Sequence, residues 1–265
     1  MILDGRAIAQ DLYAGLAQRR ASVARDIRLG IIVVGVNPVI ESFVRIKSRE
    51  AEKLNIRVVR VDLPAETTTE LAIDAVHQLA PEVDSLIVQL PMPKQIDTNA
   101  VLAAIPKEKD VDAISPNVSE HLVDAPVALA VVELLERGQI EIAGKRAVVI
   151  GAGRLVGAPS AILLRKLGAS VSMFTLDEGS IEDLKEADII VCGAGNPGFV
   201  KPEHIKDGVA IIDAGASEQA GVIRGDADPA CAEKAAVFTP VPGGVGPVAV
   251  AMIFRNLFDL VQRLV

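Results

Sequence analysis

The sequence predicts an α/β protein built from two lobes, because strand-like and helix-like segments alternate along its whole length. Half of the 265 residues are hydrophobic and only 3% are aromatic, so Val, Ile, Leu and Ala must build the core. Such a composition is typical of parallel strands that are buried between helices. Strand-like apolar runs occupy residues 30–35, 57–63, 84–90, 146–153, 169–174, 187–195 and 209–215.

Helical patterns lie between these runs. Residues 38–55 open with Pro38, which suits the first turn of a helix. Residues 67–80 open with three threonines followed by Glu70, which is a capping pattern. Strands that alternate with helices imply crossover connections, and therefore mostly parallel sheets.

A change of pattern near residues 118–145 marks the boundary between the lobes. The segment before it contains three strand–helix units, and residue 146 begins a new apolar strand that ends in a glycine turn. The last helix, over residues 247–264, could pack on either lobe. Two α/β lobes with a cleft between them is the simplest architecture for this pattern.

Charge and cysteine content argue against several classes of function. The net charge of −8 and the lack of a basic tract speak against a nucleic-acid partner. The N-terminal segment does not resemble a secretion signal, no apolar run reaches spanning length, and we expect no membrane association. Cys192 and Cys231 lie far apart without metal-ligand spacing. We therefore expect no metal site, and two free thiols in a reducing compartment, the cytoplasm.

Residues 148–164 run from an apolar strand through a glycine turn into a helix, which is the pattern of a dinucleotide-binding site. Gly151 and Gly153 allow a tight turn and let backbone N–H groups approach a pyrophosphate at the helix start. Gly157 comes four residues after Gly153, where the common fingerprint has three. An ordinary strand–helix turn is the alternative, but a second glycine-rich strand end at Gly195 favours the nucleotide.

Acidic and basic residues near this turn bear on the choice of cofactor. Asp177 or Glu178, after the next strand, could accept hydrogen bonds from a ribose 2′-hydroxyl, which favours NAD over NADP. Both acids could equally be solvated loop charges. Arg154, directly after the glycine turn, could instead hold a 2′-phosphate, so the choice between NADP and NAD stays open.

Residues 239–248, TPVPGGVGPV, combine three prolines and three glycines between a strand and a helix. Almost no helix or strand tolerates this density, and a simple turn needs only one Pro-Gly pair. We interpret the stretch as a loop that brings bare backbone against a ligand, which its residues alone do not identify.

Seven strings together carry a resemblance to one family. In chain order they are GVNPVIESFVRIK, VDSLIVQLPMP, KDVDAISP, VVIGAGRLVGAP, GAGNPGF, IDAGAS and TPVPGGVGP. Over nearly its full length the chain resembles the bifunctional methylenetetrahydrofolate dehydrogenase/methenyltetrahydrofolate cyclohydrolase family. The resemblance implies oxidation of 5,10-methylenetetrahydrofolate with NAD(P)+, hydrolysis of the methenyl product to 10-formyltetrahydrofolate, and a homodimer.

The resemblance also implies the roles of the two lobes. Residues 1–120, joined by the C-terminal helix 247–265, would form the folate-binding and catalytic domain. Residues 121–246 would form a Rossmann-type domain that binds NAD(P). The Pro-Gly-Gly loop that lines the folate cleft in the family corresponds to Pro242, Gly243 and Gly244.

Three residues match the family's catalytic positions. Lys47 matches the lysine of a Tyr-x-x-x-Lys motif, on a helix face where burial would lower its pKa and suit it to proton transfer. Gln89, at a strand end, would hold the lysine amine, and Asp112 would accept two N–H groups from the pterin edge. Phe43, one turn before Lys47, would border the same site. Without the resemblance, the lysine would pass as a surface residue and the aspartate as a loop acid.

The chain departs from the family at three places. The motif tyrosine is Phe43, a serine position is Ile40, and a Pro-Cys-Thr-Pro stretch is replaced by APVA at residues 125–128. Hydride transfer needs mainly the orientation of two planar rings, whereas hydrolysis needs a positioned water and a tuned base. We therefore expect a dehydrogenase whose cyclohydrolase activity is weakened or lost. The alternatives are a two-lobed dehydrogenase of another small substrate and a non-catalytic remnant that binds folate or nucleotide.

Overall fold

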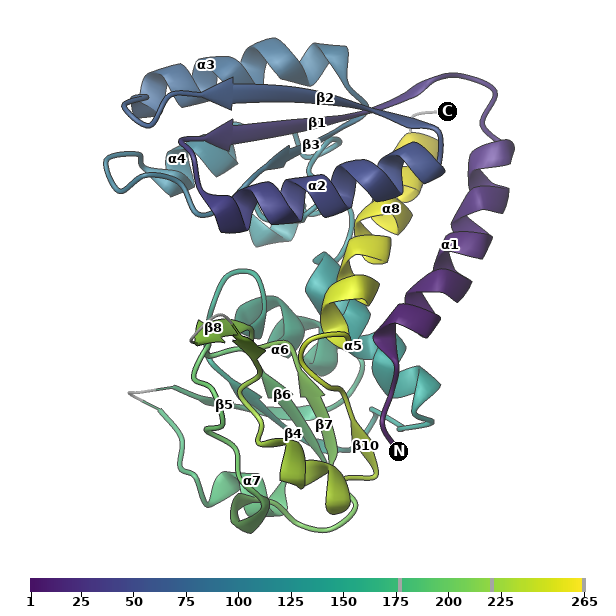
Figure 1. The fold of residues 1–265 in the computed structure, drawn as a ribbon, viewed down its shortest axis with the longest axis vertical. Helices are drawn as coiled ribbons and strands as arrows, with labels where there is room; N and C mark the ends of the chain where they lie inside the picture. Colours follow the sequence, from purple (N-terminus) through teal and green to yellow (C-terminus); the bar gives the residue numbers. More distant parts are fainter. Residues whose placement is uncertain (176–177, 220–221, 264–265) are drawn as a thin grey trace. The chain divides into compact units, whose positions relative to one another are not determined.

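The computed structural model describes residues 1–175, 178–219 and 222–263, and the chain divides into two compact units (Figure 1). Unit 1 consists of Met1–Leu12 and Ala125–Met252, and unit 2 consists of Tyr13–Asp124 and Ile253–Val265. Each unit contains its own parallel sheet with helices packed on it. The predicted α/β class with two domains is therefore confirmed.

Unit 2 is built on a three-stranded parallel sheet in the order β2-β1-β3. The central strand β1 is almost entirely buried, because Leu29, Ile31 and Ile32 have no exposed surface. Helix α1 begins in unit 1 and continues into unit 2. The elements of this part of the chain are α1 (Gly5–Ala21), β1 (Ile27–Val34), α2 (Pro38–Lys53), β2 (Ile56–Leu63), α3 (Thr69–Leu79), β3 (Ser85–Val88) and α4 (Thr98–Ala103).

Unit 1 holds a five-stranded parallel sheet in the order β10-β7-β6-β4-β5, with a separate antiparallel hairpin. Its strands are β4 (Arg146–Ile150), β5 (Ser170–Phe174), β6 (Ile189–Cys192), β7 (Ala210–Asp213), the hairpin β8 (Ser217–Gln219) and β9 (Val222–Arg224), and β10 (Val237–Phe238). Its helices are α5 (Pro126–Arg137), α6 (Gly157–Lys166), α7 (Asp183–Glu186) and α8 (Val245–Arg263), of which α8 continues into unit 2.

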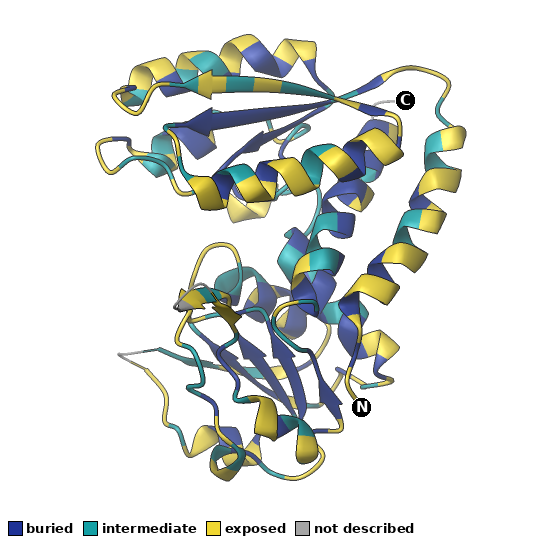
Figure 2. Ribbon diagram, viewed as in Figure 1, coloured by how far each residue is buried: buried dark blue, intermediate teal, exposed yellow. Residues whose placement is uncertain are grey.

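Both faces of the unit 1 sheet are buried, as Figure 2 shows for the central strands. Successive residues of β4 point to opposite faces. Ala147 and Val149 belong to one core cluster, whereas Val148 and Ile150 belong to another. This explains why these strands read as continuous apolar runs in the sequence. All seven strand-like runs contain a strand, β10 is the strand expected before residue 239, and the two short strands β8 and β9 were not predicted.

The units differ from the expected domain limits at both ends of the chain. The Leu3 N–H donates to the Phe238 carbonyl oxygen, and the Phe238 N–H donates to the Met1 carbonyl oxygen, each at 2.9 Å. The first residues therefore extend the sheet of unit 1. Val248 and Met252 of α8 also belong to a core cluster of unit 1, so only the later part of α8 is assigned to unit 2.

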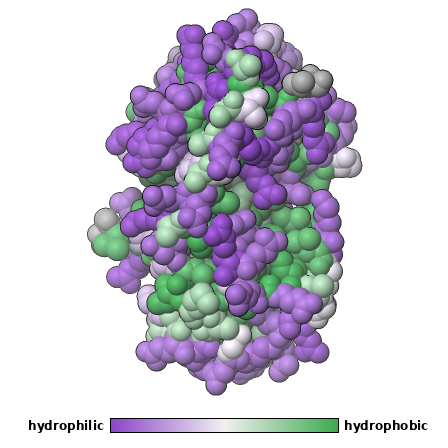
Figure 3. All heavy atoms as spheres, turned by 90° about the vertical axis from the view of Figure 1, so that its right-hand side faces the viewer, coloured by the Kyte–Doolittle hydropathy of each residue, from purple (hydrophilic) through white to green (hydrophobic). Residues whose placement is uncertain are grey.

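Helix α8 is long and apolar enough to span a membrane, the one such helix among the residues that the structure describes. Its mean hydropathy is 1.3, so the expectation that no apolar run reaches spanning length is wrong by composition. However, 61% of its apolar window is buried inside the protein, which is typical of a core helix. Hydrophilic side chains cover most of the face drawn in Figure 3.

Candidate active site

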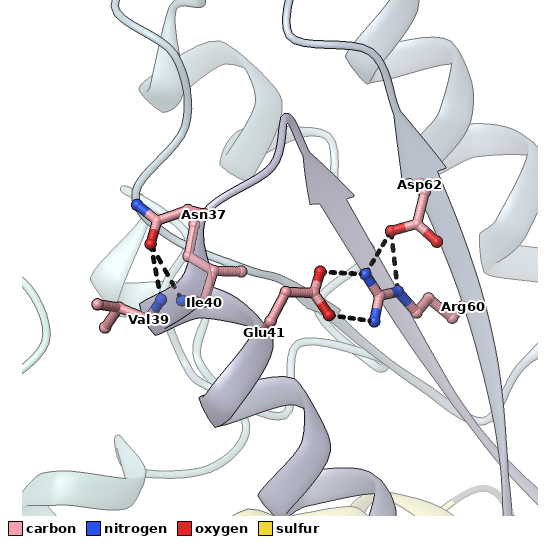
Figure 4. Close-up of polar contacts among 6 residues, drawn as sticks. All are labelled: Asn37, Val39, Ile40, Glu41, Arg60 and Asp62. Carbon is pink, nitrogen blue, oxygen red and sulfur yellow. Dashed lines mark hydrogen bonds and ion pairs between the residues drawn. The ribbon is translucent and has the colours of Figure 1, made fainter.

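Helix α2 carries two predicted site residues, and its start is fixed by a side-chain cap. The Asn37 side-chain oxygen accepts hydrogen bonds from the backbone N–H groups of Val39 (2.9 Å) and Ile40 (3.4 Å), as Figure 4 shows. Pro38 occupies the first turn, where its missing N–H costs no hydrogen bond. Cap and proline together set the residue at which the helix begins.

An ion-pair network ties the first turn of α2 to strand β2 (Figure 4). The Arg60 guanidinium donates to both carboxylate oxygens of Glu41, and its Nε donates to Asp62 Oδ1 at 2.8 Å. These hydrogen bonds lower the pKa of Glu41. Because the arginine and glutamate side chains are about one-third exposed, the network fixes the orientation of the helix more than it adds stability.

The helical period gives α2 a buried face and an exposed apolar face. Ile40 and Val44 are fully buried, whereas the Phe43 ring is 49% exposed. Val39 and Ile46 are also exposed and lie three or four residues from Phe43, on the same side of the helix. The structure therefore presents an apolar stripe that includes Phe43, beside the position of Lys47.

A hydrogen bond joins the amine of Lys47 on α2 to the side chain of Gln89 after β3. Lys47 Nζ donates to Gln89 Oε1 at 2.9 Å, and Gln89 Nε2 donates to the Leu90 carbonyl oxygen at 2.9 Å. Since a carbonyl can only accept, this second bond turns the amide oxygen toward the lysine. Gln89 directly follows β3 and is 8% exposed, so its side chain is fixed at the carboxyl end of the sheet.

Burial and a nearby carboxylate set the protonation of the lysine. Burial lowers the pKa of Lys47, and the negative charge of Asp112 opposes this shift. Burial in turn raises the pKa of Asp112, with a further increase from Asp110 and an opposing effect from the lysine. The two groups therefore titrate as a coupled pair. An amine with a lowered pKa can exchange a proton closer to neutral pH.

The two aspartates of the KDVDA stretch have different tasks. The Asp110 carboxylate is 3% exposed and accepts hydrogen bonds from the backbone N–H groups of Ile114 (3.1 and 3.0 Å) and Ser115 (2.9 Å). It closes the turn, as expected for a loop acid. Among the described residues, no donor reaches the Asp112 carboxylate by a hydrogen bond. Both of its oxygens can therefore accept hydrogen bonds from a ligand.

Sequence reasoning missed Asn256, which fixes the segment next to Asp112. This side chain on α8 is 1% exposed, and its Nδ2 donates to the carbonyl oxygens of Val111 and Asp124, each at 2.9 Å. It thus fastens both ends of the 111–124 segment. The signal in the sequence was a lone amide in the apolar helix AMIFRNLFDLV.

In unit 1, close approach of the backbone explains the glycines of the predicted nucleotide turn. A Cβ at Gly157 would lie 1.8 Å from the Gly151 carbonyl oxygen, and one at Gly151 would lie 2.7 Å from the Gly193 carbonyl oxygen. Gly151 also has a φ of +90°. A Cβ at Gly153 would meet nothing within 4 Å, so this position is open for a ligand.

These glycines lie where the strand order of the sheet reverses. Strand β4 lies between β5 and β6, and ligands of such sheets bind outside the carboxyl ends of the strands at that point. The first turn of α6 contains no acidic residue, which suits an anionic pyrophosphate at its N-terminus. The residues present therefore fit a dinucleotide.

Three further residues were predicted to bind the cofactor: Gly195, Arg154 and Asp177. Gly195, with a φ of +69°, follows β6, and its carbonyl oxygen accepts a hydrogen bond from Ser217 Oγ at 2.9 Å. Arg154 is exposed directly after the glycine turn. Asp177 lies outside the residues that the structure describes.

The Pro-Gly-Gly loop belongs to unit 1, whereas the lysine, glutamine and aspartate belong to unit 2. Gly243 has a φ of +108°, and the Gly244 N–H donates to the Pro240 carbonyl oxygen at 2.8 Å. A Cβ at Gly5 would lie 1.8 Å from the Gly244 carbonyl oxygen. Packing of the loop on the start of α1 is thus one reason for its compact backbone.

Two family models match the chain. Residues 3–112 match the catalytic domain of tetrahydrofolate dehydrogenase/cyclohydrolase, and residues 125–265 match its NAD(P)-binding domain. The bifunctional protein FolD of Lactobacillus delbrueckii subsp. bulgaricus is 38% identical and aligns over 99% of this chain and 97% of its own length. The chain belongs to the tetrahydrofolate dehydrogenase/cyclohydrolase family. The alternative of a two-lobed dehydrogenase from another family is therefore wrong.

Solved structures of this family share the fold along the whole chain. FolD from Campylobacter jejuni, a methylenetetrahydrofolate dehydrogenase/cyclohydrolase, has a TM-score of 0.95 at 30% identity, covering 100% of this chain and 99% of that one. The methylenetetrahydrofolate dehydrogenase-cyclohydrolase of Trypanosoma brucei, complexed with NADP and an inhibitor, has a TM-score of 0.93 at 35% identity, covering 100% and 98%. Methylenetetrahydrofolate dehydrogenase/cyclohydrolase chemistry with an NAD(P) cofactor is the activity of this family.

Replacing Lys47 tests the role of its amine. We expect Lys47→Met to lower the hydrolysis of methenyltetrahydrofolate by about 10²–10⁴-fold, the usual contribution of a general acid or base. The loss of methenyl absorbance measures this rate. Lys53→Met, the same change in the last turn of α2, is the matched control, because that side chain is 62% exposed. An unchanged rate in Lys47→Met would remove the proposed role.

The pH profile of the same reaction gives a second readout of this lysine. Hydrolysis that uses the neutral amine increases as the pH rises through the lowered pKa of Lys47. Asp112→Asn removes the negative charge that holds this pKa up, so the rising limb should shift to lower pH. If the rising limb of the pH–rate profile stays at the same pH in Asp112→Asn, a group other than Lys47 controls the rate.

Gly157 offers a test of the glycine turn. We expect Gly157→Ala to destabilise the fold by about 1–3 kcal/mol, because the new Cβ overlaps the Gly151 carbonyl oxygen. Gly153→Ala, whose Cβ meets nothing within 4 Å, is the control for stability. Urea unfolding of both variants measures the difference, and equal unfolding free energies would contradict the close approach of α6 to β4.

Proposed function

We propose that Lys47, Gln89 and Asp112 form the folate-converting centre of this chain, and that it oxidises 5,10-methylenetetrahydrofolate with NAD(P)+ and hydrolyses the product. The observation that supports this most is the partly buried Lys47 amine, held on Gln89 and electrostatically coupled to Asp112, inside a matched catalytic domain. The reaction class comes from the family, and the roles below come from the chemistry of the side chains.

The oxidation requires orientation more than acid–base chemistry. Bound NAD(P)+ supplies the hydride acceptor. A C–H bond of the bridging methylene breaks, its electron pair leaves with the hydride, and the cationic methenyl product forms. In our proposal the Asp112 carboxylate accepts N–H groups of the pterin edge and so orients the substrate. The exposed ring of Phe43 packs on the folate and excludes water from one side.

The hydrolysis requires proton transfer. Water adds to the methenyl carbon, and the neutral Lys47 amine accepts its proton. The hydroxyl of this adduct then loses its proton while N5 of the pteridine gains one. The bond from the carbon to N5 breaks, and the carbon stays on N10 as a formyl group. The Gln89 amide orients the amine throughout, because its own NH₂ group is fixed on the Leu90 carbonyl. The net reaction consumes one water and releases one proton.

The glycine sites of unit 1 are proposed to hold the nucleotide. Gly151, Gly153 and Gly157 place the backbone around the pyrophosphate, with Gly195 bordering the neighbouring strand end. We propose Pro242, Gly243 and Gly244 as the part of unit 1 that contacts the folate. Open space at Gly153 and the positive φ of Gly243 support a close approach of ligand to bare backbone.

We further propose a homodimer in the cytoplasm that associates with neither nucleic acid nor membrane. Strand β2 is an edge strand of its sheet, and a groove of about 560 Å³ lies beside it, with Val61, Leu63 and Leu71 in its lining. An open edge with apolar side chains beside it is suited to a second copy of the chain. The net charge of −8 and the buried core position of α8 support the other two points.

One assay tests the function and the choice of cofactor together. Methylenetetrahydrofolate is supplied with NAD+ or with NADP+, and the absorbance of the methenyl product and of the reduced cofactor is followed. We expect oxidation with both, and NAD+ at least as good as NADP+, because the stretch FTLDEG at residues 174–179 carries two acids and no Arg or Lys. A strong NADP+ preference that Arg154→Ala abolishes would contradict this order. If the protein converts no substrate with either cofactor, the alternative of a non-catalytic remnant that binds folate or nucleotide is favoured.

Phe43 and Ile40 should set the ratio of the two activities. A phenyl ring offers no hydrogen bond to the amine or to water, so we expect oxidation to outpace hydrolysis. Phe43→Tyr should raise hydrolysis, with a small gain if buried Ile40 leaves the new hydroxyl without a partner. The double variant with Ile40→Ser and Phe43→Tyr should then gain more hydrolysis than the two single variants together.

The two rates of each variant, measured side by side, decide this point. Val39→Ala, on the exposed face of α2, is the control for a general effect on the helix. A parent protein that hydrolyses the methenyl product as fast as it forms it would refute the idea. The idea would also be refuted if neither Phe43→Tyr nor Ile40→Ser changes the ratio of oxidation to hydrolysis.

A further inference from the structure

Two carboxylates are buried in unit 1, behind the glycine-rich strand end that follows β6. Asp213, at the end of β7, is 1% exposed, and Asp226, after β9, has no exposed surface. Each packs directly on a glycine. A Cβ at Gly215 would lie 2.3 Å from Asp226 Cγ, and a Cβ at Gly225 would lie 2.2 Å from Asp213 Oδ2. The two glycines therefore make the room that the carboxylates occupy.

Asp226 holds the backbone of the proposed nucleotide loop. Its Oδ2 accepts hydrogen bonds from the N–H groups of Ala194 (2.8 Å) and Gly195 (3.1 Å). The main chain at the same place adds two bonds, from the Gly198 N–H to the Gly225 carbonyl oxygen and from the Val200 N–H to the Asp226 carbonyl oxygen. The conformation of the loop after β6 thus depends on this aspartate.

Asp213 fixes the base of the hairpin that carries Asp226. Its Oδ1 accepts the Gly215 N–H at 2.9 Å, and its Oδ2 accepts the Ala227 N–H at 2.8 Å. The two bonds hold the chain on both sides of the β8–β9 hairpin. Asp213 therefore positions Asp226, and Asp226 positions Ala194 and Gly195.

The charge of this pair is not balanced by a cation. Within residues 1–175, 178–219 and 222–263, neither carboxylate forms an ion pair, and the buried Asp226 Oδ1 has no hydrogen-bond partner. Burial raises the pKa of Asp213 to about 7, with a further increase from the charge of Asp226 and opposing hydrogen bonds from backbone N–H groups. Burial and the neighbouring charge of Asp226 therefore both favour the neutral form of Asp213.

We propose that the buried Asp213–Asp226 pair positions the Ala194–Gly195 backbone for the dinucleotide, and that it does so while the Asp213 carboxyl is protonated. The proposal rests on the dinucleotide site proposed above. Loss of the proton places a second negative charge behind the loop that receives an anionic ligand. Repulsion within the pair then loosens the loop, so nucleotide affinity falls as the pH rises through the value at which the proton leaves.

Other groups near the pair do not titrate in this range. Cys192, at the end of β6, interacts with both carboxylates, and burial raises the pKa of its thiol well above its ordinary value. Burial raises the pKa of Cys231 to about 11. Both thiols stay neutral between pH 6.5 and 8.5, and the Thr239 hydroxyl, which accepts the Asp213 N–H at 2.7 Å, carries no charge. A change in this interval therefore reports on the carboxylate pair.

Binding of NADH between pH 6.5 and 8.5 tests the proposal, because NADH itself has no group that titrates there. Fluorescence titration should show a Kd that rises about tenfold across the interval. In Asp226→Asn the amide oxygen keeps the acceptor for both N–H groups, and the charge that repels an ionised Asp213 is removed. This variant should keep the low Kd of the parent at pH 6.5 and lose the pH dependence.

Asp226→Ala separates the positioning role of this side chain from its charge. Its Kd for NADH should be at least about tenfold higher at pH 6.5, while hydrolysis of methenyltetrahydrofolate, which uses no nucleotide, stays within about twofold. Glu136→Gln, an exposed carboxyl on α5 of the same unit, should keep the profile of the parent. If Asp226→Ala does not fold, the comparison of Asp226→Asn with the parent decides alone.

Two results would overturn the proposal. One is a parent Kd that does not change with pH, and the other is an Asp226→Asn variant with the slope of the parent. A parent protein that binds no NADH at any pH, yet still hydrolyses methenyltetrahydrofolate, would instead overturn the dinucleotide site on which the proposal rests.

Discussion

Removal of the Lys47 amine from water is the interaction on which the proposed chemistry of unit 2 depends. An ammonium that loses solvent loses stability relative to the neutral amine, unless fixed dipoles or charges replace the water. Here one amide oxygen and one nearby carboxylate replace it in part. The register of β1 with β3, the bond from Gln89 to Leu90 and the cap of α2 all serve to keep these groups at one place.

The two units solve the problem of binding a ligand at a sheet edge in different ways. Unit 2 places charged and amide side chains at the end of its sheet, as the proposed proton transfer requires. Unit 1 places bare backbone at the end of its sheet, as the proposed binding of an anionic pyrophosphate by N–H groups at a helix start requires. The glycines of unit 1 are also required by packing, since a Cβ at Gly157 would overlap the Gly151 carbonyl and one at Gly151 would overlap the Gly193 carbonyl. Each of these glycines thus contributes both to the packing of the fold and to the proposed nucleotide site.

The strands, the crossover helices and the glycine turn could be predicted because each depends on neighbours in the sequence. The unusual spacing to Gly157 could not be explained in this way, because its cause is contact with the Gly151 carbonyl. Asn256 and Asp226 escaped prediction for the same reason: their partners lie far along the chain, at Val111 and at Ala194. The short hairpin β8–β9 carries too few apolar residues to show the alternating apolar pattern that indicates a strand. The pKa shift of Lys47 was expected only with the family motif, because a helix face alone does not show what covers it.

Substrate binding and base strength are coupled in the arrangement of Lys47 and Asp112. When a pterin donates N–H groups to Asp112, the carboxylate stays ionised, and its charge continues to favour the protonated lysine. The same ligand displaces water from the amine, which favours the neutral form. In the proposed site, a folate that packs on the exposed ring of Phe43 removes water from that face and so strengthens the second effect. In the proposed site, a folate that covers the amine therefore favours the neutral form that accepts a proton. A tyrosine at position 43 would add a hydroxyl that can hold the attacking water or the amine, whereas phenylalanine offers a hydrogen bond to neither.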